Sequence, residues 1–481
     1  MKRTLSRRTF LQSSLTASAS LAGLVACGGG GSGATIPASS GGGTGGGGNA
    51  GAFTNPILIV INVDGGWDWL NVLPPDSGTN LTAYQTRRST LKITPATTLG
   101  SGVGLNGDFI GLDVLHAQGR VAWVTGLSMP SPNLSHFTAG DLWAQGGTTG
   151  SNPTTLNGTG WLGRFGDQTF DAANAIQGIT TVSSVHRMIA GARRSFIPIT
   201  STNGFRYPGS LRNTTLQTPY STDTTLLQSA YNLAASSVSS DSVSRAAYEL
   251  IAKSQKSFYD ATQSMSSLTS RTPSVPYPGD SNYINTNGAA LSGSLSSQFK
   301  LIASMIAANL PIQVYYCRLG GWDTHSNQLT TMKNLLSTLG GSIKSFYDDL
   351  GTITTSTGLA QNRVMMMTWS EFGRRVTENS GGTDHGTNSL SLCIGNSIKG
   401  GLYGAYPNLA SLDNNGNMRY SSDSDFRSMY ATVLDRWLGQ ATTSTNTLLG
   451  SKYARMNFLE DPKVSLQPQG YFRENLSLRL S

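Results

Sequence analysis

The residues of this sequence that are best suited to chemistry are histidines and carboxylates gathered in short polar clusters. Three of the five histidines fall in these clusters, two of them one or two residues after an aspartate. The candidate metal ligands are Asp64, Asp68, Asp323, His325, Glu371, Asp384 and His385. Carboxylate and imidazole groups together are a ligand set for Zn, Mn or Fe. Several such groups converging on one point would form a hydrolytic site with one or two metal ions.

Each cluster also has a structural interpretation. A lone Asp-x-His usually marks a surface turn or a helix cap, and Asp323 could cap the helix expected after it. Glu371 and Arg374, three residues apart, could form a structural ion pair. His116 and His186 lie outside the clusters and are expected to be structural or surface residues. The placement of the clusters after separate strand or loop signals favours a functional site.

The clusters follow segments that we expect to form a sheet. Continuous apolar runs predict buried strands at residues 56–63, 121–125, 312–319, 363–369 and 390–394. Helices are predicted at about 225–267, 297–309, 328–350 and 425–438, and a loop is predicted at 382–386. Ligands of open α/β sheets gather at the carboxyl ends of the strands, so we expect the clusters to meet there.

The alternation of strands and helices sets the expected fold class. It predicts parallel βαβ units and a doubly wound, mostly parallel α/β sheet sandwiched by helices. A Ser/Thr/Asn-rich stretch from about 145 to 225 has weak periodicity and is expected to be an inserted cap. Cys317 and Cys393 lie in apolar runs, so we expect both to be buried and unpaired, although a disulfide between them is possible.

The first 55 residues predict export and a tether. Arg7 and Arg8, followed by a short apolar stretch, resemble a bacterial twin-arginine signal. That stretch ends in a lipobox-like segment in which Cys27 would carry the lipid. We therefore expect the twin-arginine export machinery and a membrane as partners, and a location in the periplasm or cell envelope. The expected divisions are a signal at 1–27, a flexible Gly/Ser-rich linker at 28–55, a globular domain at 56–455 and a tail at 456–481.

The charge composition argues against nucleic acid as a partner. Charged residues make up 12% of the chain, against about 25% in an average soluble protein. The net charge is +8, but the four basic residues at positions 2, 3, 7 and 8 supply half of it. The remaining 30 basic and 26 acidic residues give a weak electrostatic basis for binding a polyanion.

A series of motifs in a fixed order carries a family resemblance. The motifs are Gly65-Gly66-x-Asp68, Ser135-His136-Phe137, Gly160-Trp161-Leu162-Gly163-Arg164, Gly321-Trp322-Asp323-Thr324-His325, Ser370-Glu371-Phe372-Gly373-Arg374, Thr383-Asp384-His385-Gly386 and Lys399-Gly400-Gly401-x-Tyr403-Gly404. Their order resembles the DUF1501 family, bacterial proteins with twin-arginine signals that are grouped with the alkaline phosphatase and sulfatase-like superfamily. The resemblance covers roughly residues 56–440 and implies an alkaline phosphatase-like fold.

The resemblance also implies roles for individual residues. Superfamily enzymes hold two metal ions, usually zinc, and use a Ser or Thr nucleophile, here Ser135. Asp323 and His325 would bind one ion, and either Asp64 or Asp68 would be the ligand after the first strand. Two placements compete for the rest.

In the first placement, Asp384 and His385 form the Asp-His pair of the superfamily. In the second, which we favour, Glu371 takes that place at a strand end and His385 is the last histidine. The second placement leaves the site one histidine short of the superfamily pattern.

The chemistry implied is hydrolysis of phosphate esters. Sulfate esters are less favoured, because no Cys/Ser-x-Pro-x-Arg motif occurs. His136 beside Ser135 is a further catalytic candidate, and Arg164 or Arg374 would neutralise charge on the oxyanion. The alternative is a non-catalytic envelope protein that keeps the fold for binding or assembly. An oxidoreductase with an organic cofactor is disfavoured, because no Gly-x-Gly-x-x-Gly follows the first strand.

Overall fold

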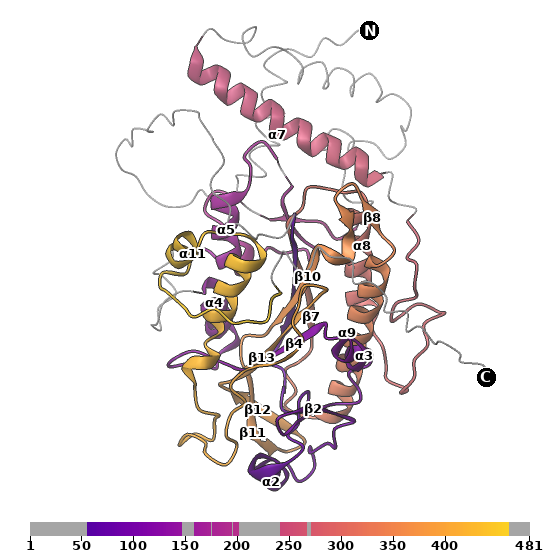
Figure 1. The fold of residues 1–481 in the computed structure, drawn as a ribbon, viewed down its shortest axis with the longest axis vertical. Coiled ribbons are helices and arrows are strands. Elements are labelled where there is room, and N and C mark those ends of the chain that lie inside the picture. The colour runs from indigo at the N-terminus through magenta and orange to yellow at the C-terminus, as the bar shows by residue number, and fades with distance from the viewer. Residues whose placement is uncertain are drawn as a thin grey trace, which may run out of the picture.

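A computed structural model describes residues 55–146, 158–174, 176–194, 196–201, 241–266 and 271–460. Its centre is an eight-stranded sheet in the order β14-β4-β13-β10-β1-β7-β5-β6, with helices on both sides (Figure 1). Strand β13 runs antiparallel to both of its neighbours, and the other pairs in this sheet are parallel. The predicted mostly parallel α/β sheet is therefore confirmed.

All five strands predicted from apolar runs belong to this sheet. The eight strands of the sheet are β1 (Ile57–Asp64), β4 (Val121–Leu127), β5 (Gly178–Thr180), β6 (Ile197–Pro198), β7 (Val314–Gly320), β10 (Val364–Trp369), β13 (Ser389–Ile394) and β14 (Gly401–Gly404). Strand β1 pairs in parallel with β7 and β10, with Asp64 opposite Gly320 and Asn62 opposite Trp369. The carboxyl ends of these three strands therefore meet at one edge.

Alternate residues of β1 bury against two separate cores. Ile57, Ile59 and Ile61 pack into the core that includes helices α3 (Leu112–Ala117), α8 (Ser294–Ala307) and α9 (Gln328–Leu350). Leu58 and Val60 point the other way. Their core includes α4 (His136–Gln145), α5 (Trp161–Thr169), α10 (Phe426–Thr432), the π-helical turn η7 (Val433–Trp437) and α11 (Thr442–Leu449). Figure 1 shows the two groups of helices on opposite sides of the sheet.

The remaining elements are short or lie at the ends of the molecule. They are α2 (Gly78–Arg87), the hairpins β2 (Thr97–Gly100)–β3 (Val103–Leu105) and β8 (Thr354–Thr355)–β9 (Gly358–Leu359), the turns η2 (Arg187–Ile189), η5 (Ala360–Asn362) and η6 (Ser422–Ser424), and the long helix α7 (Ser242–Ser266). Helix α7 lies across the end of the molecule opposite α2 (Figure 1). None of the described helices has the length and hydropathy needed to cross a membrane.

The hairpin that follows β10 corrects a sequence expectation. Residues 382–386, expected as a loop, form strand β12 (Gly382–Gly386), which pairs antiparallel with β11 (Gly373–Asn379). The pairing places Arg374 opposite His385. The hairpin therefore carries both side chains to the carboxyl edge of the main sheet.

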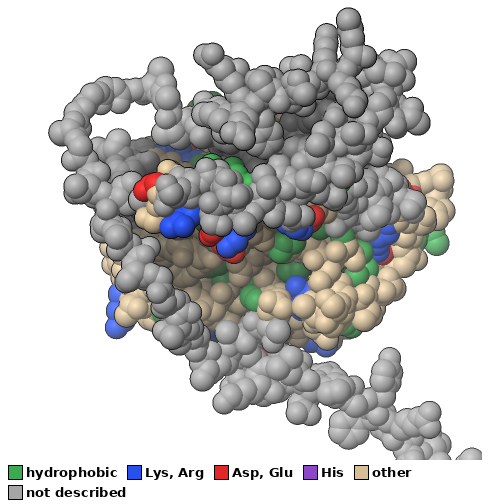
Figure 2. Space-filling view, turned by 90° about the horizontal axis from the view of Figure 1, so that it is seen from above, with side chains coloured by type: hydrophobic (Ala, Val, Ile, Leu, Met, Phe, Trp, Pro, Cys, Tyr) green, Lys and Arg blue, Asp and Glu red, His purple; other side chains and the backbone are tan. Residues whose placement is uncertain are grey.

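The described part of the stretch expected as an inserted cap extends the main fold. Helix α5 packs into one core, while β5 and β6 add two strands to the edge of the sheet. Cys317 and Cys393 are buried and free, on strands separated by β1 and β10. On the face in Figure 2, described Lys and Arg side chains lie close to Asp and Glu side chains and among hydrophobic ones.

Several predictions concern residues outside the described ranges. The predicted twin-arginine pair Arg7 and Arg8, the predicted lipidation site Cys27 and residues 28–54 of the predicted linker precede the first described residue. Most of the expected tail and the first part of the helix expected at 225–267 also lie outside.

Candidate metal centre

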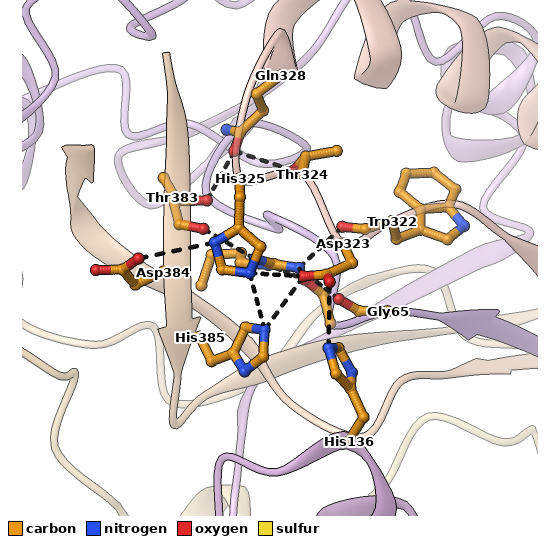
Figure 3. A network of polar contacts seen from close by, with 12 residues as sticks. Gly65, His136, Trp322, Asp323, Thr324, His325, Gln328, Thr383, Asp384 and His385 are labelled. Atoms are coloured by element: carbon orange, nitrogen blue, oxygen red, sulfur yellow. Dashed lines mark hydrogen bonds and ion pairs between the residues drawn. The ribbon is translucent and has the colours of Figure 1, made fainter. Parts of the chain in front are cut away.

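Asp323 lies at the centre of the cluster of polar side chains at the carboxyl edge of the sheet. It follows β7, and its carboxylate faces His136 from the start of α4 and His385 from β12 (Figure 3). One ligand atom from each of these three residues lies within 4.8 Å of the others, close enough for all three to bind one metal ion. The cluster joins residues from three elements that are distant in sequence.

His325 completes a tight triangle around one carboxylate oxygen. Its Nε2 atom lies 2.9 Å from Oδ1 of Asp323 and 3.1 Å from Nε2 of His385, which is itself 3.1 Å from that oxygen. His136 approaches the other oxygen, with Nε2 3.4 Å from Oδ2 of Asp323. All three imidazoles therefore direct Nε2 toward the same carboxylate.

The Nδ1 atoms of the same rings face acceptors. Nδ1 of His136 lies 2.7 Å from Oε1 of Glu371, and Nδ1 of His385 lies 2.8 Å from the carbonyl oxygen of Leu134. Nδ1 of His325 faces Oδ1 of Asp384 at 3.7 Å. A proton on Nδ1 of His136 and of His385 satisfies the first two acceptors and leaves the lone pair on Nε2, which is the tautomer that binds metals. This pattern assigns Asp384 an orienting position behind His325.

Glu371 is a buried carboxylate that hydrogen-bonds the ring of His136. Its side chain is 3% exposed, and its carboxylate accepts hydrogen bonds from the backbone N–H of Gly65 at 3.0 Å and from the Ser370 hydroxyl at 3.1 Å. The hydrogen bond to Glu371, reinforced by its charge, raises the pKa of His136 above its ordinary value. The carboxylate of Glu371 thus holds the imidazole of His136 in place, and it is not free to bind a metal ion itself.

Arg374 is a buried cation beside Asp323. Its side chain is 0% exposed and donates to the carbonyl oxygens of Gly65, Gly66 and Thr383 as well as to Oδ1 of Asp323. Burial alone would raise the pKa of Asp323, but the hydrogen bond and charge of Arg374 lower it to about 2. Asp323 is therefore a carboxylate at neutral pH.

Gly65 allows β1 to approach the loop that carries Asp323. Its φ is +127°, and a Cβ atom there would lie 2.5 Å from the backbone nitrogen of Asp323. A positive φ and this contact together exclude any side chain.

Burial lowers the pKa of His385, which favours the neutral form of this imidazole.

A cavity of about 680 Å³ opens beside the cluster. Its lining includes Asp64, His136, Phe137, Asp141, His186, Arg187, Arg318, Asp323, Trp369 and Glu371. Two ion pairs cross its wall, one between Asp64 and Arg318 and one between Asp141 and Arg187, the latter at 2.9 Å. The cavity therefore combines a candidate metal centre with two guanidinium groups.

His186, which was expected to be structural or at the surface, also lines this cavity. Its Nδ1 accepts a hydrogen bond from the backbone N–H of Met188 at 3.1 Å, and its ring stacks on Tyr316. Burial lowers its pKa to about 4, so the ring is neutral at physiological pH. No motif surrounds His186 in the sequence, so spacing alone could not have identified it.

Burial distinguishes Asp64 from Asp68 as the candidate metal ligand after the first strand. Asp64 lines the cavity, whereas Asp68 forms an ion pair with Arg88 in which both side chains are 0% exposed. Gln328 also donates to Asp68, at 2.5 Å. The structure therefore places Asp68 in a buried polar network away from the cavity lining.

Two further candidates are not brought into the cavity. Arg164 donates to the carbonyl oxygens of Thr159, Gln145 and Leu448, so it ties α5 to α4 and α11. Ser135 is exposed at the N-cap of α4, and its hydroxyl makes no hydrogen bond to a described residue. Arg374 and His136 are the catalytic candidates that the fold brings to Asp323.

Comparison with known families places these motifs in context. A family model described as "Protein of unknown function (DUF1501)" matches residues 123–449, from β4 to the end of α11. No curated protein matches the chain. The matched range includes His136, Asp323 and His385 and covers more than half of the 481 positions. The chain therefore belongs to the DUF1501 family.

Proposed function

We propose that the protein is a metal-dependent hydrolase of phosphate esters with an alkaline phosphatase-like domain. Hydrolysis of sulfate esters is the less favoured variant. One observation carries the proposal: three imidazoles direct Nε2 toward Asp323 while Nδ1 of each faces an acceptor. This orientation is typical of histidines in metal centres, where the outer partner fixes the ring.

The ligand set favours zinc. His136, Asp323 and His385 would hold the ion through two imidazole nitrogens and one carboxylate oxygen, with His325 adjacent. Three protein ligands and an open position are typical of catalytic zinc sites. A bound ion of this kind polarises an ester oxygen and lowers the pKa of water.

The surrounding side chains would bind and orient the ester. Arg318 and Arg187 lie on the cavity wall, each in an ion pair with an aspartate, and their guanidiniums would hydrogen-bond an anionic group of the ester. Glu371 holds the ring of His136, and Arg374 holds the carboxylate of Asp323. We favour water over Ser135 as the nucleophile, because Ser135 does not line the cavity.

We propose that this domain acts outside the cytoplasm. The twin-arginine segment around Arg7 and Arg8 would engage the export machinery, and lipid on Cys27 would hold the protein at a membrane. The Gly/Ser-rich residues 28–55 would then give the domain reach from that surface.

A non-catalytic envelope protein is the second candidate. The observation in its favour is the ion pair of Asp323 with Arg374, since a guanidinium already balances the charge of the central carboxylate. In this interpretation, the polar cluster around Asp323 stabilises the fold, and the protein serves in binding or assembly.

Metal analysis of the purified full-length chain separates the two candidates. We expect tightly bound zinc after dialysis, and its loss in an Asp323→Asn variant. Asp423→Asn is a matched control, because Asp423 is an exposed aspartate in η6 outside the cavity lining. Hydrolysis of p-nitrophenyl phosphate but not of the sulfate, lost with Asp323→Asn, would complete the proposal. No bound metal after reconstitution with zinc, manganese or iron would overturn it.

A further inference from the structure

The resemblance to the alkaline phosphatase superfamily implies a second metal ion, and two further carboxylates, Asp64 and Glu371, line the same cavity. Asp64 follows β1 and Glu371 follows β10, so both reach the cavity from neighbouring strands. The contacts of these two side chains decide whether a second ion fits.

Neither carboxylate is free. Asp64 forms an ion pair with the guanidinium of Arg318. Oε1 of Glu371 accepts from Gly65 N–H at 3.0 Å and from His136 at 2.7 Å, while Oε2 accepts from the Ser370 hydroxyl at 3.1 Å. Glu371 is also 3% exposed, so releasing it would leave buried donors without an acceptor.

Two arginine side chains supply positive charge beside these carboxylates. Arg374 is 0% exposed and uses all three of its side-chain nitrogens, with Nη2 bonded to Asp323. This guanidinium therefore places a positive charge in direct contact with the carboxylate of Asp323. Arg318 adds a second guanidinium at the cavity wall, against Asp64.

We infer that the centre takes one divalent cation, held by His136, Asp323 and His385. The guanidinium groups of Arg374 and Arg318 supply the positive charge that a second ion would otherwise provide. This inference rests on the proposed function for its single ion and goes further by excluding the second.

Charge balance gives the physical reason. The four carboxylates of Asp64, Asp323, Glu371 and Asp384 and the two guanidiniums of Arg318 and Arg374 together carry a net charge of −2. One divalent ion would neutralise this charge, and a second would raise it to +2 in a partly buried site. Accumulated like charge of this kind is costly beside Glu371 and Arg374, because both side chains are buried and water screens their charges poorly.

The test is zinc stoichiometry of the full-length chain by equilibrium dialysis and elemental analysis. We expect about one equivalent in the parent and about one in Asp64→Asn, since Asp64 is not a ligand here. Asp323→Asn should lose the ion. Arg318→Met removes one positive charge at an exposed position, so zinc should bind roughly three- to tenfold tighter.

The outcomes separate this inference from the proposed function. Two equivalents in the parent would overturn the single-ion inference and leave the hydrolase standing, as would loss of an ion in Asp64→Asn. Absence of metal from every form would overturn both. Manganese substitution gives an independent readout, because a lone ion has a six-line paramagnetic resonance spectrum, whereas two adjacent ions couple.

Discussion

The Nδ1 atom of His136 lies 2.7 Å from Oε1 of Glu371, although 235 residues separate the two positions. The contact joins the first residue of α4 to the residue two positions after β10. Because Glu371 is buried and bonded to the backbone of Gly65, it holds the imidazole ring from the core side. Nε2 is left to face Asp323 and the cavity.

Replacing Glu371 with glutamine should weaken metal binding. The change keeps the side-chain volume but weakens the hydrogen bond from His136 and removes the charge behind it, which together raise the pKa of this ring, so the ring becomes a poorer ligand. We expect zinc affinity to fall by roughly 10- to 100-fold. Competition with a chelator of known affinity measures the change.

Asp384→Asn is the matched control for Glu371→Gln. Asp384 stands behind His325 at 3.7 Å, too far for a hydrogen bond, so its loss should have a smaller effect on zinc affinity. Equal losses in the two variants would contradict the specific role of Glu371.

Arg374→Met should destabilise the fold. The variant leaves the buried carbonyl oxygens of Gly65, Gly66 and Thr383 without their donor, at a cost of at least about 2 kcal/mol in the free energy of unfolding. Arg374→Lys should recover little, because an ammonium cannot reproduce the guanidinium fork. Urea denaturation measures both. Arg419→Met, at an exposed arginine whose side chain bonds the carbonyl oxygen of Leu412, should cost far less.

Much of the site could be predicted because parallel strands end at a shared edge. Asp323 and Glu371 each follow an apolar run, and pairing of β1 with β7 and β10 brings the two run ends together. The sequence pattern therefore located these residues without knowledge of any side-chain contact. His385 was found by its neighbour Asp384, although the strand that carries it was expected as a loop.

The remaining features depend on contacts that no local pattern encodes. Asp68 resembled a ligand by spacing, but its environment is set by Arg88, whose burial follows from packing against the β11 hairpin. Arg164 stood in a family motif, yet its donors are used by carbonyls of helices α4 and α11. His186 reaches the cavity only because β5 joins the sheet beside β7.

The protein should lose stability as the pH falls from about 6.5 to about 4, in part through His186. Burial lowers the pKa of this ring from 6.5 to about 4, so in that window the unfolded chain binds a proton that the folded chain does not. Unfolding therefore becomes easier as pH falls, by up to about 3 kcal/mol from this group. Comparing urea denaturation of the parent and His186→Gln at about pH 7 and about pH 5 isolates this contribution. An equal pH dependence in both proteins would refute the assignment.

Gly65→Ala should damage the metal centre through the backbone. The φ of +127° is unfavourable for alanine, and the new Cβ would lie 2.5 Å from the nitrogen of Asp323, so the loop carrying this carboxylate must move. We expect loss of bound zinc together with destabilisation of roughly 2–4 kcal/mol. Gly416→Ala controls for strain alone, because Gly416 also has a positive φ (+76°) but no atom lies within 4 Å of its would-be Cβ. It should cost about 1 kcal/mol and keep its zinc. Retention of zinc by Gly65→Ala would show that the close approach of β1 does not position Asp323.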